Sequence, residues 1–345
     1  MRFNISDAIS WLVPESVYLK FTVHNDTSAT IVMAAGAHCF IERVRIFAAG
    51  VPIEEITQFS KLIEMVKKFV PVNPVEEVYQ GKKGTSIPNM STVEMGLPLS
   101  QGVLGFFNSP LLWPLRYASL TLQIVLQSNA EDALTTGTTF KILNPTIVGQ
   151  KCELDEDTES SVHSHLASGK VLPIHIKTFW NTQQSVLSAG TLNLGISKSI
   201  SRLAAVWNVF NENNDTPTYF PSPGKRELSV RVGSVNYPDR PLASKQMMLY
   251  TTLAGMNLLK PGNALHIPAL TAAEYLGATN DASAFITRIS MEKADEGFIL
   301  SGEASLQSGA QVTVTLKNAI CDSITTVLEY DKLIEISNSG VAEME

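Results

Sequence analysis

Apolar and polar residues alternate with a period of two along several stretches of this chain. The clearest stretches are 17–23, 120–126, 228–232 and 312–316. Such alternation places one face of a strand in a core and the other face outward, as in antiparallel sheets. Clusters of Gly, Pro, Asn and Asp separate the stretches, for example at 216–225, and are typical of turns between short strands. The pattern therefore predicts an all-β protein.

Two stretches follow a helical spacing instead. Between residues 53 and 70 the apolar residues recur at helical intervals, with Glu54 and Glu55 in the first turn, which predicts an amphipathic helix. A second helix is predicted from Asp239, which could cap its start, to Gly255, which is placed to end it. Each half of the chain thus contains one helix among predicted strands.

The surroundings of these two helices repeat. At one constant offset Val44, Arg45, Ile46, Pro52, Ile56 and Ile63 pair with Val230, Arg231, Val232, Pro238, Leu242 and Leu249. The same offset places the Ala-Ser-Leu tripeptide at 118–120 on an identical tripeptide at 304–306. Because an internal repeat indicates a duplicated structural unit, we expect two similar β-domains, each with a strand, a turn containing Pro, and a helix.

The length of 345 residues also favours two domains, since single cores usually stop growing at roughly 250 to 300 residues. An acidic stretch separates two β-rich regions and is predicted to be a short helical linker. The predicted division is 1–150 for the first domain, 151–169 for the linker and 170–345 for the second domain. The polar stretches 73–96 and 258–284 lack clear periodicity and are predicted to be long loops.

Composition restricts the classes of partner. Charged residues make up 17% of the chain, against about 25% in typical soluble domains, which favours surface buried against other copies or partners. The net charge is -7 and no stretch gathers the Lys and Arg needed to neutralise phosphates, so direct nucleic-acid binding is not expected. The start of the chain lacks a signal-peptide pattern, and the most apolar run, 29–41, is too short to span a bilayer. We therefore expect neither secretion nor membrane insertion.

The three cysteines, Cys39, Cys152 and Cys321, lie far apart, and an odd count argues against a disulfide framework. We expect reduced, buried thiols. His38 precedes Cys39 in an apolar stretch, and a packed pair is expected there rather than a pair of metal ligands.

The main candidate for a metal site is the His163-x-His165 pair beside the acidic residues of the predicted linker. Such a pair can bind a metal on a strand, where both imidazoles share a face. On a helix, positions two apart diverge around the axis, so solvated linker residues are expected instead. The strings 81–86 and 195–199 contain residue types of a phosphate loop and a nucleophile elbow in the wrong arrangement. No catalytic, cofactor-binding or metal-ligating residue is predicted, and no cofactor.

Several blocks resemble, in the same order, the double jelly-roll major capsid proteins of the nucleocytoplasmic large DNA viruses and their smaller relatives. The blocks are a turn rich in Pro and Leu with its following strand at 113–122, the acidic linker at 154–159, an early strand of the second domain at 201–209, and the closing strands at 300–338. Together they touch both halves of the chain.

The resemblance implies two tandem jelly rolls, each an eight-stranded β-sandwich with a short inserted helix. It further implies a structural protein of the virion rather than an enzyme, with three copies forming a pseudo-hexagonal capsomer of an icosahedral shell. The implied partners are other copies of the chain, penton and minor capsid proteins, and an internal membrane.

Two other functions fit an all-β chain. A carbohydrate-binding or adhesion module of two β-sandwiches would be expected to carry a signal peptide, disulfides or an aromatic platform on its loops. A cupin-like enzyme would need a compact ligand set of three His and one Glu inside one barrel, which the six histidines do not supply.

Overall fold

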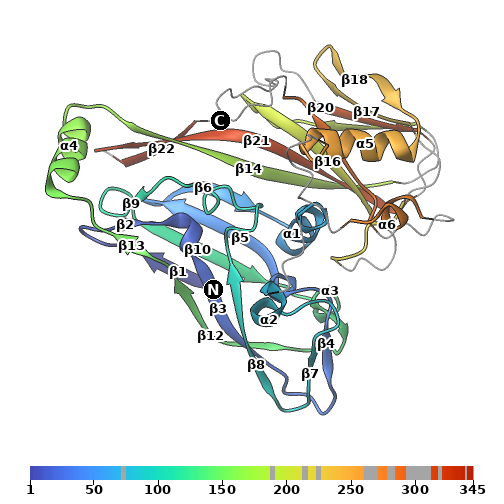
Figure 1. Cartoon of the computed structure of the whole chain (residues 1–345), viewed down its shortest axis with the longest axis horizontal. Helices are drawn as coiled ribbons and strands as arrows, with labels where there is room; N and C mark the ends of the chain where they lie inside the picture. The colour runs from blue at the N-terminus through green and yellow to red at the C-terminus, as the bar shows by residue number, and fades with distance from the viewer. Residues whose placement is uncertain are drawn as a thin grey trace. The chain divides into compact units, whose positions relative to one another are not determined.

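The computed structural model divides into two compact units, whose elements are drawn in Figure 1. It describes residues 1–70, 75–186, 191–211, 217–222, 227–259, 270–277, 284–292, 312–317, 321–338 and 340–344. The first unit contains residues 1–64, 73–178 and 332–344, and the second contains 65–72 and 179–331. The predicted division of the sequence at residues 150 and 170 stays a prediction.

Eight strands, which contain the strands of the second unit, form two antiparallel sheets; residues 172–178 and 332–337, at the ends of two of these strands, belong to the first unit. One sheet has the order β14 (Leu172–Ser185), β21 (Ser323–Ser337), β16 (Leu203–Asn211) and β19 (Ile286–Ser290). The other has the order β15 (Thr191–Ile196), β20 (Val312–Lys317), β17 (Glu227–Val232) and β18 (Val235–Leu242). Counted along the chain, these orders are first, eighth, third, sixth and second, seventh, fourth, fifth, which is the strand order of a jelly roll. The predicted all-β class is confirmed.

The first unit repeats this order with seven strands in its two main sheets. One sheet has the order β1 (Arg2–Ile5), β10 (Leu120–Leu126), β5 (Ile41–Ala48) and β6 (Val51–Ile56), and the other β12 (Lys141–Val148), β3 (Tyr18–His24) and β8 (Thr92–Pro98). Two small sheets have the orders β11 (Leu134–Thr136), β4 (Ile31–Met33), β7 (Ser86–Ile87) and β13 (Lys151–Cys152), β2 (Trp11–Leu12), β9 (Trp113–Pro114). Strand β22 (Gly340–Met344) pairs with the end of β21.

Short helices connect the strands. They are α1 (Phe59–Lys67), α2 (Glu76–Gln80), α3 (Ala130–Ala133), α4 (Glu156–Ala167), α5 (Lys245–Gly255) and α6 (Ala272–Leu276), with 3-10 turns at Pro14–Ser16 and Ala37–Phe40. The helix predicted in the acidic stretch is confirmed as α4, whose first turn is capped by Asp155, since the Asp155 side chain accepts from the Thr158 backbone N–H at 2.9 Å. No helix in the described part of the chain is long and apolar enough to cross a membrane.

Alternation predicted the one-sided strands correctly. In β3, Leu19, Phe21 and Val23 are buried while Tyr18 and Lys20 are exposed. Strands β10, β17 and β20 show the same alternation of buried residues with more exposed ones. The apolar faces of these strands contribute to the cores of their units, as the period of two requires.

The helix predicted over 53–70 was wrong in its first third. The segment Val51–Ile56 is strand β6, and the helix begins only at Phe59, after Gln58 has adopted a positive φ of 50°. Pairing with β5 overrides the local helical spacing here. It also buries the Glu54 side chain, which the sequence placed in an exposed first helical turn.

The second helix was predicted to start at Asp239, which is also wrong. Asp239 lies in β18, and the helix begins after Ser244, whose hydroxyl accepts from the Met247 backbone N–H at 3.2 Å. The predicted end is confirmed, because Gly255 is the last residue of α5.

The internal repeat is confirmed at the level of elements. Strands β5 and β6 followed by α1 correspond to strands β17 and β18 followed by α5. The matched tripeptide at 304–306 lies outside the described residues. The hairpin turns lie at Ala49–Gly50 and at Gly233–Ser234, so the second turn comes two positions earlier than the constant offset places it. The reason is that the register shift in the β17–β18 pairing leaves more unpaired residues in β18 than the shift in the β5–β6 pairing leaves in β6.

The stretch 73–96 was wrongly predicted to be a long loop. It contains α2 and β7, and its last part belongs to β8, which pairs with β3 along its whole length. The corresponding stretch 258–284 contains α6, while 260–269 and 278–283 lie outside the described residues.

Candidate functional site

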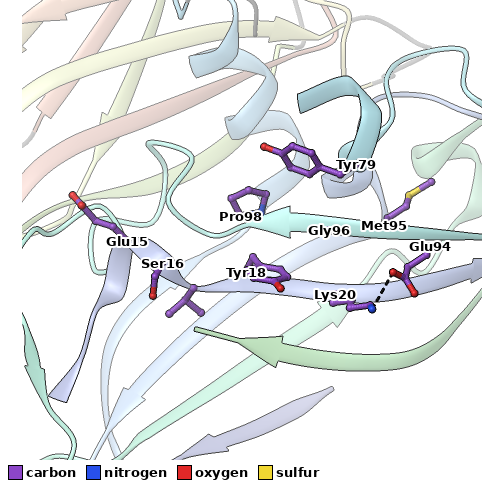
Figure 2. A pocket seen from close by; sticks show the side chains of 10 residues that line it. Glu15, Ser16, Tyr18, Lys20, Tyr79, Glu94, Met95, Gly96 and Pro98 are labelled. Carbon is purple, nitrogen blue, oxygen red and sulfur yellow. Dashed lines mark ion pairs between the residues drawn. The ribbon is translucent and has the colours of Figure 1, made fainter. Parts of the chain in front are cut away.

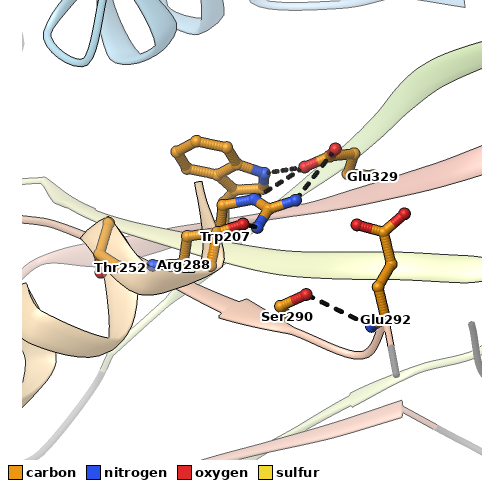
Figure 3. A network of polar contacts seen from close by, with 7 residues as sticks. Trp207, Thr252, Arg288, Ser290, Glu292 and Glu329 are labelled. Atoms are coloured by element: carbon orange, nitrogen blue, oxygen red, sulfur yellow. Dashed lines mark hydrogen bonds and ion pairs between the residues drawn. The ribbon is translucent and has the colours of Figure 1, made fainter. Parts of the chain in front are cut away.

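A buried polar cluster lies in the second unit, on the strands β16, β19 and β21 (Figure 3). The indole Nε1 of Trp207 donates to Oε2 of Glu329 at 2.8 Å, and Nε of Arg288 donates to the same oxygen at 3.0 Å. Nη2 of Arg288 donates to the other carboxylate oxygen at 3.2 Å. The guanidinium also lies 5.4 Å from the centre of the Trp207 ring, within the range of a cation–π contact.

Helix α5 joins this cluster through one side-chain hydroxyl and one backbone carbonyl. The backbone N–H of Arg288 donates to the Thr252 hydroxyl at 3.0 Å, and its Nη1 donates to the Gly255 carbonyl at the end of the helix. A Cβ atom at Gly255 would lie 3.0 Å from Nη1, so a glycine allows this close approach. The centre of the Phe69 ring lies 5.8 Å from that of the Trp207 ring, in an edge-to-face arrangement. The cluster is therefore fixed by three strands and one helix.

Period-two alternation in the closing strand β21 predicts one buried face, with Glu329 and Asp331 on a solvent face. That expectation was wrong, because every residue from Ser323 to Lys332 is buried. Glu329 is buried because it receives the Arg288 and Trp207 donors. An irregularity at Lys332 and Leu333 also follows from the sequence pattern and stays a prediction, while the pairing of β16 with β21 shifts register between Leu203 and Ala205. One sequence signal pointed to this: β16 is an almost uninterrupted apolar run, and it is buried at every position, as in strands covered on both faces.

A second buried cluster lies in the first unit around Glu54. Its carboxylate accepts from the backbone N–H groups of Gly105 at 2.8 Å and Phe106 at 3.1 Å, and from the Thr178 hydroxyl. Burial raises the pKa of Glu54, although these donors and the charge of Lys332 act in the opposite direction. A Cβ atom at Gly105 would collide with the Lys177 carbonyl at 2.0 Å, so only glycine fits beside this cluster.

A surface groove of about 530 Å³ lies over the outer face of β3 and β8 in the first unit (Figure 2). Tyr18 and Tyr79 border it at Gly96, where a Cβ atom would lie 4.0 and 3.8 Å from their rings. The two rings are 37% and 40% exposed. Lys20 and Glu94 form an ion pair of 2.9 Å in the groove. The groove thus combines two accessible aromatic rings with charged groups.

The histidines singled out in the sequence contact other groups. Nδ1 of His163 lies 3.3 Å from the Tyr117 hydroxyl, and Nε2 of His165 lies 3.2 Å from the Val171 carbonyl. Within the described residues no group of three His, Cys, Asp or Glu side chains could hold a metal ion. His38 is buried, with Nε2 2.7 Å from Glu64 Oε1, and burial raises the pKa of the neighbouring thiol of Cys39 to about 12.

The strings that resembled reactive motifs belong to ordinary structural features. Lys82, in the string 81–86, forms an exposed ion pair of 2.7 Å with Glu77. Gly195 lies in the regular strand β15, opposite Thr313 of β20, rather than at a turn from a strand into a helix. Neither segment has the geometry of a phosphate loop or a nucleophile elbow.

Comparison with known proteins gives a match only at the level of structure. No family model matches the chain, and no curated protein matches its sequence. Among solved structures, the chain resembles PBCV-1 VP54, fitted into a reconstruction of the virophage Sputnik, with a TM-score of 0.68 and 10% identity over 100% of this chain and 92% of the other. It resembles the Faustovirus major capsid protein with a TM-score of 0.58 and 10% identity over 97% of this chain and 87% of the other.

The chain has the double jelly-roll fold of viral major capsid proteins. The structure of the PBCV-1 virus capsid also matches, with a TM-score of 0.62 and 10% identity over 100% of this chain and 92% of the other. In this double jelly roll the buried polar clusters around Glu54 and Glu329 each lie within one unit. There they connect strands to neighbouring segments through hydrogen bonds and, at Glu329, an ion pair.

Proposed function

We propose that the chain is a structural major capsid protein, three copies of which form a pseudo-hexagonal capsomer of an icosahedral virus shell. The observation that carries this proposal is the likeness to viral capsid structures over the whole chain, through both units. A chain of two similar sandwiches supplies six similar bodies to a trimer, so a single gene product can tile a lattice with sixfold symmetry. The duplicated domain would therefore allow a trimer to occupy a sixfold position of the lattice.

Composition supports the same role. A charged fraction of 17% is low for a protein whose whole surface meets water, whereas the centres of subunit interfaces are depleted in charge. The buried charged groups described above, Glu54, Arg288 and Glu329, form hydrogen bonds and ion pairs between strands and neighbouring segments, which fits a structural role. In the virion, other copies of the chain would be the main partners. Penton and minor capsid proteins and an internal membrane would be further ones.

Electron microscopy of the purified full chain tests the proposal directly. We expect pseudo-hexagonal trimers or closed shells, and light scattering at micromolar concentration should give the mass of three chains or more. A strictly monomeric protein across the buffers in which capsid proteins assemble would overturn the proposal.

Saccharide binding is the second candidate function, because the Tyr18–Tyr79 groove provides an aromatic surface beside polar groups, as many ligand sites do. Its test is saturation-transfer NMR of the full chain with cellotriose and chitotriose. Binding that is lost in Tyr79→Ala and retained in Tyr250→Ala, where the exposed ring lies outside the groove, would support it. No transfer to either saccharide would exclude this candidate for neutral glucans and chitin fragments.

A further inference from the structure

One sheet of the first unit has an edge whose counterpart in the second unit is covered. The sheet β12, β3, β8 corresponds to β21, β16, β19, because both follow the same jelly-roll order and the constant offset of the repeat places β3 on β16. In the second unit β21 lies between β16 and β14. Its counterpart β12 pairs with β3 on one side, and among the described residues no strand pairs with its other side.

Exposure agrees with this difference in pairing. No residue of β12 is buried, and the Leu143 side chain is 38% exposed. By contrast, β21 is buried at every position from Ser323 to Lys332. A free edge leaves a row of backbone N–H and C=O groups without strand partners, and such a row is a template for an added strand.

A groove runs beside this edge. It has a volume of about 510 Å³ and is lined from one side by residues of β1 and from the other by residues at the end of β12. Apolar and polar residues share its lining. The apolar ones are Phe3, Ile5, Leu12, Val17, Pro145 and Ile147, and the polar or charged ones are Arg2, Asn4, Ser6, Thr146 and Lys151. The counterpart of β1 in the second unit is β15, and the strand that precedes β15 along the chain is β14. The groove therefore lies between the counterparts of β15 and β21, where the jelly-roll order places the strand that corresponds to β14.

The sequence of β12 restricts how the edge can be used. Asn144 adopts a positive φ of 49°, and the pairing with β3 shifts register between Leu143 and Thr146. Pro145 has no N–H to donate. Bulges and prolines on an edge strand prevent non-specific pairing with strands of other molecules. They leave Thr146–Val148, next to the groove, as the stretch that can accept a partner.

We propose that this groove binds an extended segment of a second polypeptide chain as an added strand, antiparallel to Thr146–Val148. The segment needs apolar side chains at alternate positions, to face the groove, and polar ones between them. The beginning of strand β14 shows this pattern, since Ile174 and Ile176 are buried and His175 and Lys177 are exposed. Backbone hydrogen bonds would supply affinity, and the apolar side chains of the groove would supply selectivity. The proposal rests on the fold and does not require the capsid role.

The test uses a fluorescein-labelled peptide with the β14 sequence, LPIHIKTFWNTQQS, and the full chain. We expect saturable binding by fluorescence anisotropy, together with slower hydrogen exchange of the amides at Thr146–Val148. A peptide that carries Asp in place of both Ile174 and Ile176 should not bind. Absence of binding, or protection confined to β21, which would mean replacement of β14 within the second unit, overturns the proposal.

Two variants of the same strand locate the site. Ile147→Lys replaces an apolar side chain of the groove with a charged one and should weaken peptide binding by at least about tenfold. Leu143→Lys changes an exposed apolar residue of β12 that does not line the groove, and should leave the affinity unchanged. Equal effects of the two variants would place the peptide elsewhere. The exchange experiment on the unaltered chain decides the matter even if one variant folds poorly.

Discussion

Arg288 on β19 and Glu329 on β21 form a buried ion pair, with Nε 3.0 Å from Oε2, although β16 lies between their two strands. Only 6% and 7% of their side chains are exposed. The guanidinium passes over the Trp207 ring of β16, whose N–H donates to the same carboxylate. The pair therefore links three strands at once, and both charges are largely shielded from bulk water.

Replacing Glu329 with Gln should strongly destabilise the second unit. The change removes the negative charge and leaves the Arg288 guanidinium buried without its counter-ion, a loss that costs roughly 3–5 kcal/mol when one partner of a buried pair is removed. Urea unfolding followed by tryptophan fluorescence measures the free energy of unfolding. If Glu329 faced solvent, as the alternation predicts, the same change would alter the free energy of unfolding only slightly.

An exposed ion pair in the same unit provides the matched control. Glu227 on β17 lies 2.6 Å from Lys317 on β20, with side chains 42% and 46% exposed. Glu227→Gln should therefore lower the free energy of unfolding by only about 0–1 kcal/mol. Similar losses for both variants would mean that Glu329 is solvated in solution.

Replacing Leu328 with Asp tests the core of the second unit. Leu328 is fully buried on β21, opposite Val206 of β16, so the change buries an unpaired carboxylate and removes apolar packing. The expected cost is on the order of 4 kcal/mol or more, and soluble, assembled protein should largely disappear. Val235→Asp, at a position of β18 that is 44% exposed, should remain soluble. Normal assembly of the Leu328 variant would contradict the register of β21.

The three thiols should react at different rates. Burial raises the pKa of Cys39 to about 12, so almost no thiolate forms at pH 8, while Cys152 and Cys321 are partly exposed. A thiol reagent should therefore label at most two cysteines of the native chain and all three in urea. Rapid labelling of Cys39 before unfolding, detected by peptide mass spectrometry, would show that the 3-10 turn at Ala37–Phe40 opens readily.

The sequence predicted those parts of the fold that depend on local patterns. Strands such as β3 could be found because one face is buried and the other is not. The beginning of the first helix could not, since Glu54 is held by backbone N–H groups of Gly105 and Phe106, far away along the chain. Period-two alternation also predicted the wrong environment for Glu329, because the groups that donate to its carboxylate lie on β16 and β19. The apolar run of β16 was the one signal in the sequence that polar residues on the neighbouring strands would be buried.

Glu54 should make the stability of the chain depend on pH. Burial raises its pKa above the ordinary value of 4.5, so the folded state holds this proton more firmly than the unfolded state does. As the pH rises from about 4.5 through the raised pKa, the unfolded state loses its proton first, and the free energy of unfolding falls. Below pH 4.5 the carboxyl is protonated in both states, and its contribution no longer changes.

Glu54→Gln removes this titration while leaving only one oxygen to accept from Gly105, Phe106 and Thr178. We expect the variant to be less stable than the unaltered chain at pH 4.5, because its amide group would face a backbone N–H group, and the difference should shrink as the pH rises. Glu55→Gln is the matched control, since the neighbouring carboxylate is 43% exposed and pairs with Arg45 at 2.7 Å. Urea unfolding of the three proteins between pH 4 and 8 measures the slopes. The difference in stability between the Glu54 variant and the unaltered chain could instead stay constant or grow with pH. That result would mean that the hydrogen-bond donors around Glu54, and not its burial, determine its pKa.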